Sequence, residues 1–164
     1  MATITLHGNP FKTCGELPAV GTTAPNFTLV NSAMENVSLE NFPGQKKLLN
    51  IVPSLDTPIC ATSTKKFNAT TINNAVMLVI SADLPFAQKR FCTEFNINTV
   101  VPLSMMRSRK FAKDYGVLIE DGPLAGITAR AIVVLDENNR VIHTELVPEI
   151  AQEPDYDKAL ALLS

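Results

Sequence analysis

The chain has 164 residues, about the length of one ordinary domain, and 46% of them are hydrophobic and 18% charged. This composition excludes a disordered or low-complexity chain, and we expect a single domain spanning residues 1–164. The formal net charge of −2 provides no basic surface for nucleic acid or for an anionic membrane, so neither is expected as a partner.

Membrane insertion, secretion and metal binding are not predicted either. No apolar stretch approaches the roughly 20 residues that a membrane-spanning helix needs. Residues 1–10 do not have the basic flank followed by an apolar segment that is typical of a secretory signal, so we expect a cytoplasmic protein. Its three cysteines form no C-x-x-C pair and it has only two histidines, which argues against a zinc site.

The predicted elements begin with a small hairpin at the amino terminus. Thr3 to Leu6 alternate polar and apolar side chains, a Gly-Asn-Pro turn follows, and the chain returns at Phe11 and Lys12. Short runs rich in valine, isoleucine and leucine then predict six strands, at residues 27–30, 48–52, 76–80, 99–103, 131–135 and 141–146.

Helices are predicted between these strands from the spacing of apolar residues. One helix starts near Thr57, and three others are predicted at residues 84–95, 109–115 and 156–163. In the helix at 84–95, we expect Phe86, Phe91 and Phe95 to form a stripe that packs on the core or on a second subunit, and part of this stripe to line a substrate entrance.

The order of these elements predicts an α/β fold. Strands and helices alternate through the middle of the chain, which favours parallel strands with helices on both faces of the sheet. The last two strands are joined by the turn-rich residues 136–139, which predict an antiparallel hairpin. A mixed sheet of the thioredoxin type fits this order.

The segment around Cys60 has the features of a helix start. Thr57 suits the N-cap and Pro58 the first helical position, so Cys60 is third in the first turn. Unpaired backbone N–H groups at the positive end of a helix favour the thiolate, and only the thiolate is a good nucleophile. A helix terminus typically stabilises a nearby negative charge by about 0.3–1 kcal/mol, whereas lowering the pKa of a thiol by about two units takes roughly 2.7 kcal/mol. We therefore expect a nearby cation as well, and Arg130 is the candidate.

Each of these residues also has a plainer interpretation. A lone cysteine is more often a small buried hydrophobe than a nucleophile, and Cys92 within a predicted helix can be a packing residue for the same reason. Arg130 alone is typical of a surface charge. Cys14 is expected to be an unreactive thiol, the alternative being a mixed or intersubunit disulfide under oxidation. His7 and His143 are expected to be surface residues without a role.

The sequence resembles a known family at these residues. Pro53, Thr57 and Cys60 match the P-x-x-x-T-x-x-C pattern of the peroxiredoxins, and the chain is similar to one branch of them, the bacterial thiol peroxidases of the atypical two-cysteine type. The resemblance covers nearly the whole chain. Its other blocks are residues 80–88 leading to Cys92, residues 121–124 leading to Arg130, and residues 153–156.

The resemblance implies a thioredoxin fold with an added N-terminal hairpin, a homodimer, and no metal, flavin or haem. It makes Cys60 the peroxidatic cysteine, Cys92 the resolving cysteine of the same chain, and Pro53, Thr57 and Arg130 the residues of the pocket. Members of this branch reduce hydrogen peroxide and organic hydroperoxides through a sulfenic acid and an intramolecular disulfide, here Cys60–Cys92, with thioredoxin as the electron donor. Because the two cysteines are on different predicted helices, we expect both segments to unwind or shift when the disulfide forms.

Two other functions are compatible with the residues taken alone. A cysteine hydrolase would need His143 beside Cys60 as its base. A redox-sensing binding module would use the same disulfide to switch a partner surface, and it differs from an enzyme in being oxidised once and not repeatedly.

Overall fold

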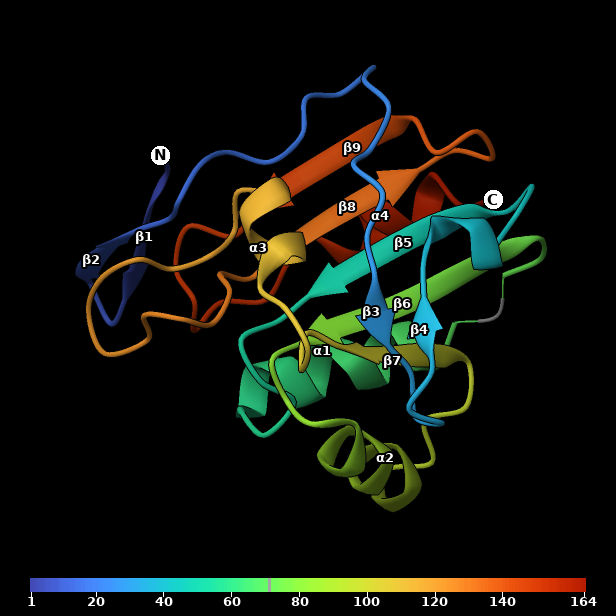
Figure 1. Cartoon of the computed structure of the whole chain (residues 1–164), viewed down its shortest axis with the longest axis horizontal. Helices are drawn as coiled ribbons and strands as arrows, with labels where there is room; N and C mark the ends of the chain where they lie inside the picture. Colours follow the sequence, from blue (N-terminus) through green and yellow to red (C-terminus); the bar gives the residue numbers. More distant parts are fainter. Residues whose placement is uncertain (71) are drawn as a thin grey trace.

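The computed structural model describes residues 1–70 and 72–164. The strands are β1 (Thr3–Leu6), β2 (Asn9–Lys12), β3 (Leu29–Val30), β4 (Asn36–Val37), β5 (Lys46–Ile51), β6 (Ala75–Ser81), β7 (Val100–Ser104), β8 (Ala131–Leu135) and β9 (Val141–Leu146). The helices are the 3-10 helix η1 (Leu39–Asn41) and the α-helices α1 (Pro58–Asn68), α2 (Pro85–Glu94), α3 (Lys110–Asp114) and α4 (Tyr156–Ala161) (Figure 1).

The described strands form a mixed sheet of seven strands in the order β4-β3-β7-β6-β5-β8-β9, beside the separate β1–β2 pair. Strands β5, β6 and β7 are parallel, because α1 and α2 form the crossovers between them. Strands β8 and β9 form the antiparallel hairpin that the turn-rich residues predict. The predicted mixed α/β sheet and the predicted N-terminal hairpin are both confirmed.

The central strands separate two apolar clusters, one on each face of the sheet. Along β5, Leu49 and Ile51 belong to the cluster under α3, whereas Leu48 belongs to the cluster under α1, α2 and α4. Figure 1 shows α3 in front of the sheet and α1 and α4 behind it. Helices therefore cover both faces, as predicted, and the two faces have separate cores. None of the helices in the described residues has the length and hydropathy needed to span a bilayer.

The predicted ends of most elements lie within two residues of those in the structure. Strands β8 and β9 have the predicted bounds, α2 and α3 are each one residue shorter than predicted at both ends, and α4 ends two residues earlier than predicted. The strand predicted at 27–30 contracts to β3, because the Phe27 amide donates to Asn26 Oδ1 at 2.9 Å. Strand β4 was not predicted, since its two residues are too short to show a period.

The N-terminal hairpin packs on the end of the chain and on the segment before β8. Thr5 pairs with Glu149 in a parallel bridge, and the Ile150 amide donates to the Thr5 carbonyl at 2.8 Å. Phe11 packs against Gly122, where a Cβ atom would lie 2.2 Å from the phenyl ring and where φ is +74°. The hairpin is thereby held next to the loops that surround the first turn of α1.

Candidate functional site

Helix α1 starts as its sequence predicts. Thr57 is the N-cap in an extended conformation, with φ −84° and ψ 145°, and its Oγ1 accepts a hydrogen bond from the Cys60 amide at 3.3 Å. Pro58 is the first helical residue, where its missing N–H leaves no donor unpaired. Cys60 is therefore the third residue of the first turn, among the free amides of the helix N-terminus.

The Cys60 side chain is fully buried, with 0% exposure, in the apolar cluster that includes Val52 and Leu55. The Cys60 carbonyl accepts hydrogen bonds from Ser63 Oγ at 3.0 Å and from Thr64 Oγ1 at 2.9 Å. Such side-chain bonds to the preceding turn slightly destabilise and bend a helix. The turn that carries Cys60 is thus well packed, but its helical conformation is only weakly stabilised.

Arg130 is buried immediately before β8, with only 1% exposure. Its Nε donates to the Ile150 carbonyl at 3.0 Å, and its Nη1 has no hydrogen-bond partner among the described residues. The interpretation of Arg130 as a surface charge is therefore wrong. Burying a guanidinium with an unpaired donor lowers the stability of the fold. A ligand that accepts a hydrogen bond from this donor would remove that loss.

Three of the predicted site residues, Pro53, Thr57 and Arg130, line one cavity of about 650 Å³. Cys60 does not itself line it, but Thr57, Pro58 and Ile59, the three residues before it, do. The cavity therefore lies against the first turn of α1. Its volume is in the range of small-molecule sites. The other lining residues, most of them apolar, are Leu6, His7, Ser54, Leu124, Ile127, Ile150 and Ala151.

The wall contributed by the hairpin was not predicted. The Glu149 carboxylate accepts hydrogen bonds from Thr5 Oγ1, from the His7 amide at 2.8 Å and from the Gly8 amide at 3.3 Å. The bond from Thr5, followed by those from the backbone, lowers the pKa of Glu149 to about 2. The ionised carboxylate thereby holds the hairpin turn in place, which puts Leu6 and His7 on the cavity wall.

The two histidines differ in their surroundings. His7 is exposed, as expected, but it lies on the cavity wall. His143, on β9, is half-buried, and its Nε2 is buried without a hydrogen-bond partner in the described part of the chain. His143 is therefore not the simple surface residue that was expected. It is also not one of the described residues that line the cavity, where a hydrolase would need it.

Cys92 lies away from this cavity. It is half-buried on α2 and lines a different hollow together with Lys89 and Val101. Burial raises the pKa of the Cys92 thiol. Cys60 and Cys92 are both free thiols. The structure places Pro53, Thr57 and Arg130 around the cavity at the turn that carries Cys60, and it places Cys92 at the other hollow. The expected shift of both helices stays a prediction.

Cys14 and the three phenylalanines of the predicted stripe are not among the described residues that line the cavity. Cys14 is a free, half-buried thiol whose Sγ lies 3.8 Å from the Ala112 carbonyl oxygen at α3. Phe91 is buried in the core, whereas Phe86 is exposed and Phe95 lies with its ring centroid 4.9 Å from that of Phe91. None of the three phenylalanines is among the described residues that line the cavity, so the expectation that they line the entrance is wrong.

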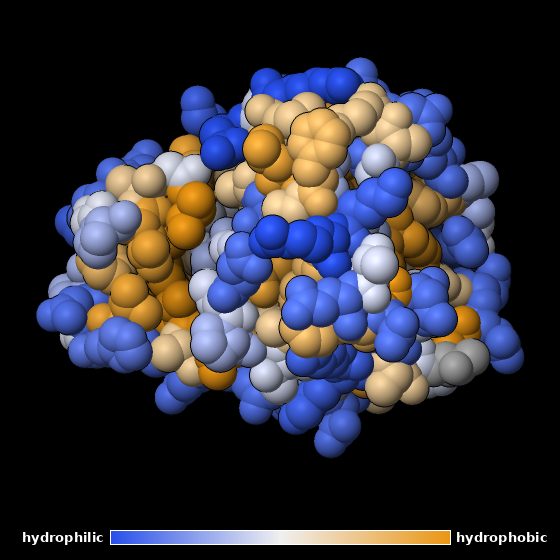
Figure 2. All heavy atoms as spheres, turned by 90° about the horizontal axis from the view of Figure 1, so that it is seen from below, coloured by the Kyte–Doolittle hydropathy of each residue, from blue (hydrophilic) through white to orange (hydrophobic). Residues whose placement is uncertain are grey.

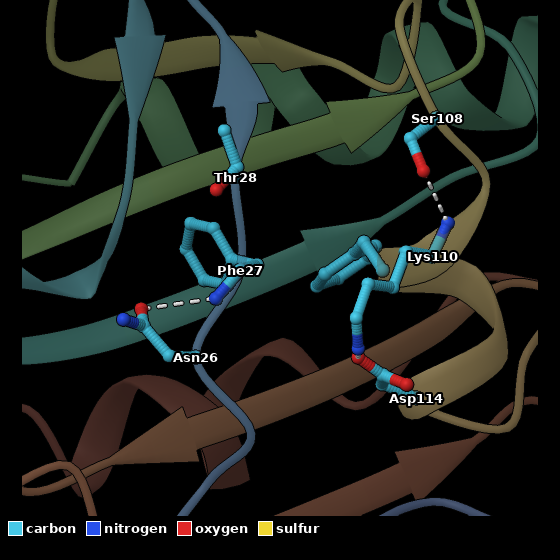
Figure 3. Close-up of a pocket in the computed structure, with 7 residues that line it drawn as sticks. Asn26, Phe27, Thr28, Ser108, Lys110 and Asp114 are labelled. Atoms are coloured by element: carbon cyan, nitrogen blue, oxygen red, sulfur yellow. Dashed lines mark hydrogen bonds and ion pairs between the residues drawn. The ribbon is translucent and has the colours of Figure 1, made fainter.

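A smaller hollow of about 230 Å³ lies beside α3, on the face of the sheet opposite α1. Figure 3 shows that its polar groups pair with one another: Lys110 with Asp114, and the Lys110 amide with Ser108 Oγ at 3.0 Å. It contains none of the predicted site residues. Among the described residues there is also no group of three or more His, Cys, Asp or Glu side chains placed to hold a metal ion. The cavity at α1 is therefore the candidate site.

The comparisons with known proteins agree on one family. The model of the Redoxin family matches residues 19–160. Thiol peroxidases of Mycobacterium tuberculosis (strain H37Rv) and Mycobacterium bovis are each 54% identical to this chain over 164 residues, 99% of both sequences. A peroxiredoxin-like protein from Aquifex aeolicus, 41% identical, superposes with a TM-score of 0.93 over 99% of this chain and 96% of its own. The thiol peroxidase from Chromobacterium violaceum, 28% identical, has a TM-score of 0.89 over 98% of this chain and 94% of its own.

Proposed function

The chain belongs to the Redoxin family, in its thiol peroxidase branch and with a thioredoxin-like fold, and we propose that Cys60 is the residue through which this enzyme reduces peroxides. The observation that carries the proposal is the buried guanidinium of Arg130, whose Nη1 has no partner among the described residues and which belongs to a residue that lines the cavity at the first turn of α1. A hydroperoxide entering this cavity meets a fixed positive donor beside the helix N-terminus that holds Cys60.

In the proposed reaction, the Cys60 sulfur attacks the terminal oxygen of a hydroperoxide that is bound in the cavity against the first turn of α1. A sulfur–oxygen bond forms and the oxygen–oxygen bond breaks, so Cys60 becomes a sulfenic acid and the peroxide is reduced. The departing oxygen takes up a proton and leaves as an alcohol or water. Arg130 donates to the oxygen on which negative charge develops.

Thr57 and Pro53 complete the site in different ways. The Thr57 hydroxyl donates to the Ser54 carbonyl at 3.2 Å and accepts from the Cys60 amide. Because a hydroxyl has two acceptor lone pairs, Thr57 can also accept the O–H of the hydroperoxide. Pro53 is buried on the cavity wall, where it keeps bulk water from the sulfur.

We further propose that Cys92 resolves the sulfenic acid. Its thiol attacks the Cys60 sulfur, a disulfide forms and water leaves, and thioredoxin reduces the disulfide by thiol exchange. The free thiol on the neighbouring helix supports this assignment. Its raised pKa makes it a weak nucleophile while it is packed, so resolution requires Cys92 to leave its half-buried place. No cofactor takes part in these steps.

The cavity and the surface support the remaining assignments. Apolar walls formed by residues such as Ile127 and Ile150 accommodate organic hydroperoxides as well as hydrogen peroxide. Leu84 and Phe86 at the start of α2 are 51% and 70% exposed, and the face seen in Figure 2, on the α2 side, has apolar surface between charged side chains. A second copy of the chain would cover such a patch, which favours a homodimer. The cytoplasm, with its thioredoxin system, is the compartment that suits this chemistry.

Continuous turnover distinguishes this enzyme from a redox-sensing module. Purified protein at catalytic concentration, with thioredoxin, thioredoxin reductase and NADPH, is expected to consume many equivalents of an organic hydroperoxide per chain. The readout is NADPH oxidation together with the loss of peroxide. Consumption that ends after one equivalent per chain, with thioredoxin present, would favour the sensor.

Arg130→Met is expected to lower kcat/KM for peroxide by about 100-fold, because removing one preorganised donor to a developing oxyanion typically has an effect of this size. The measurement is the rate of Cys60 oxidation as a function of peroxide concentration. Arg140→Met is the matched control, since Arg140 is exposed and its guanidinium also donates to a carbonyl, that of Gly21 at 3.2 Å. Equal rates in Arg130→Met and Arg140→Met would exclude Arg130 from the reaction.

A further inference from the structure

Asp83 connects the two loops that precede the cysteine-bearing helices. It lies between β6 and α2, two residues before the first residue of α2. Its Oδ1 accepts from Ser54 Oγ at 2.7 Å, and its Oδ2 accepts from the Leu55 amide at 2.7 Å. Ser54 and Leu55 belong to the loop between β5 and α1, which leads to Cys60. One carboxylate thus holds the start of α1 to the start of α2.

The α2 side of this connection is fixed firmly. Ser81 Oγ donates to Asp83 Oδ2 at 2.8 Å and accepts from the side-chain amide of Gln88, which is fully buried on α2, at 3.1 Å. The Asp83 carbonyl accepts from Ser104 Oγ at 2.6 Å. Asp83 is therefore anchored to β6, β7 and α2, and the part that can move is the loop of Ser54 and Leu55.

The connection continues to Cys60 through the helix cap. The Ser54 carbonyl accepts from both the Thr57 amide, at 3.3 Å, and the Thr57 hydroxyl, at 3.2 Å. Thr57 Oγ1 in turn accepts from the Cys60 amide. A chain of hydrogen bonds therefore runs from Asp83 through Ser54 and Thr57 to the backbone of Cys60. Hydrogen bonds to a carboxylate are among the strong ones in proteins, so Asp83 is the firmest point of this chain.

We propose that Asp83 is a positioning residue that holds Cys60 in the arrangement that reacts with peroxide, and that its bonds to Ser54 and Leu55 break before Cys60 reaches Cys92. The proposal rests on the proposed roles of the two cysteines. A disulfide needs the two Cα atoms within about 7 Å. Cys92 lines a hollow separate from the cavity at the first turn of α1, and the Asp83 carboxylate holds that turn in its place through Ser54.

The proposal predicts opposite effects on the two half-reactions. Asp83→Asn keeps the shape of the side chain but removes the charge, so the loop is held less firmly. We expect the rate constant for Cys60 oxidation by peroxide to fall by about tenfold, the rate constant for disulfide formation to rise severalfold, and excess peroxide to convert less Cys60 to sulfinic acid. Because the sequence has no tryptophan, both steps are followed by quenched flow and mass spectrometry.

Two further variants make the test decisive. Ser54→Ala removes one of the bonds to Asp83 and is expected to shift both rates in the same directions by a smaller factor, so it decides the question if Asp83→Asn does not fold. Asp157→Asn, at an exposed carboxylate of α4, is the matched control and is expected to leave both rates unchanged. Parallel slowing of both steps, or no change in either, overturns the proposal. If wild-type Cys60 is not oxidised at all, the proposed function itself has failed.

Discussion

Cys60→Ser is expected to abolish peroxide consumption in the thioredoxin-coupled assay. A serine hydroxyl remains protonated at neutral pH and is a weak nucleophile without an adjacent base. His143, the residue that a hydrolase would need as its base, is not among the described residues that line the cavity. His7 is among them, at the hairpin turn, where its backbone amide donates to Glu149. A sulfur atom develops the negative charge that the attack requires much more readily than an oxygen atom does.

The matched control for this prediction is Cys14→Ser. It makes the same atomic change at a free thiol that is half-buried against α3, and it is expected to leave the rate of peroxide consumption unchanged. Thermal unfolding of both variants checks that the loss of activity is not a loss of fold. Peroxide consumption by Cys60→Ser at more than a small fraction of the wild-type rate would mean that another thiol is the nucleophile.

The parts of the fold that the sequence predicted are those with local signals. Strands β8 and β9 were predicted with their bounds because two runs rich in valine, isoleucine and leucine flank a turn-rich segment. The hairpin of β1 and β2 was visible in the alternation of side chains around a Gly-Asn-Pro turn. Strands β3 and β4 have only two residues each, so their pairing depends on the neighbouring strand β7 and leaves no periodic pattern.

The same distinction holds for the site. The start of α1 could be predicted because the cap, the proline and Cys60 are within four residues, and their chemistry is local. Arg130 was named as the cation, but its burial depends on the Ile150 carbonyl, a contact that no local pattern indicates. The hairpin wall depends on Glu149, which binds the His7 amide across 142 positions of sequence. Such contacts follow from the topology of the sheet and not from any segment alone.

Cys92→Ser is expected to reduce about one equivalent of hydroperoxide per chain and then to stop in the thioredoxin-coupled assay. Peroxide reacts at Cys60 without help from Cys92, which lines a different hollow, so the first step should proceed at the wild-type rate. The sulfenic acid then has no second thiol on the chain placed to condense with it, and thioredoxin receives no disulfide to reduce. The measurement is a burst of peroxide loss, with the oxidised state of Cys60 identified by mass spectrometry.

A small dithiol separates this outcome from simple inactivation of Cys92→Ser. Dithiothreitol can attack the Cys60 sulfenic acid directly, so it is expected to restore turnover of Cys92→Ser while thioredoxin alone does not. Cys14→Ser serves again as the control and should turn over with either reductant. Continued turnover of Cys92→Ser with thioredoxin alone would assign resolution to Cys14 or to the reductant itself. In that case α2 would have no need to move, because Cys92 would form no bond with Cys60.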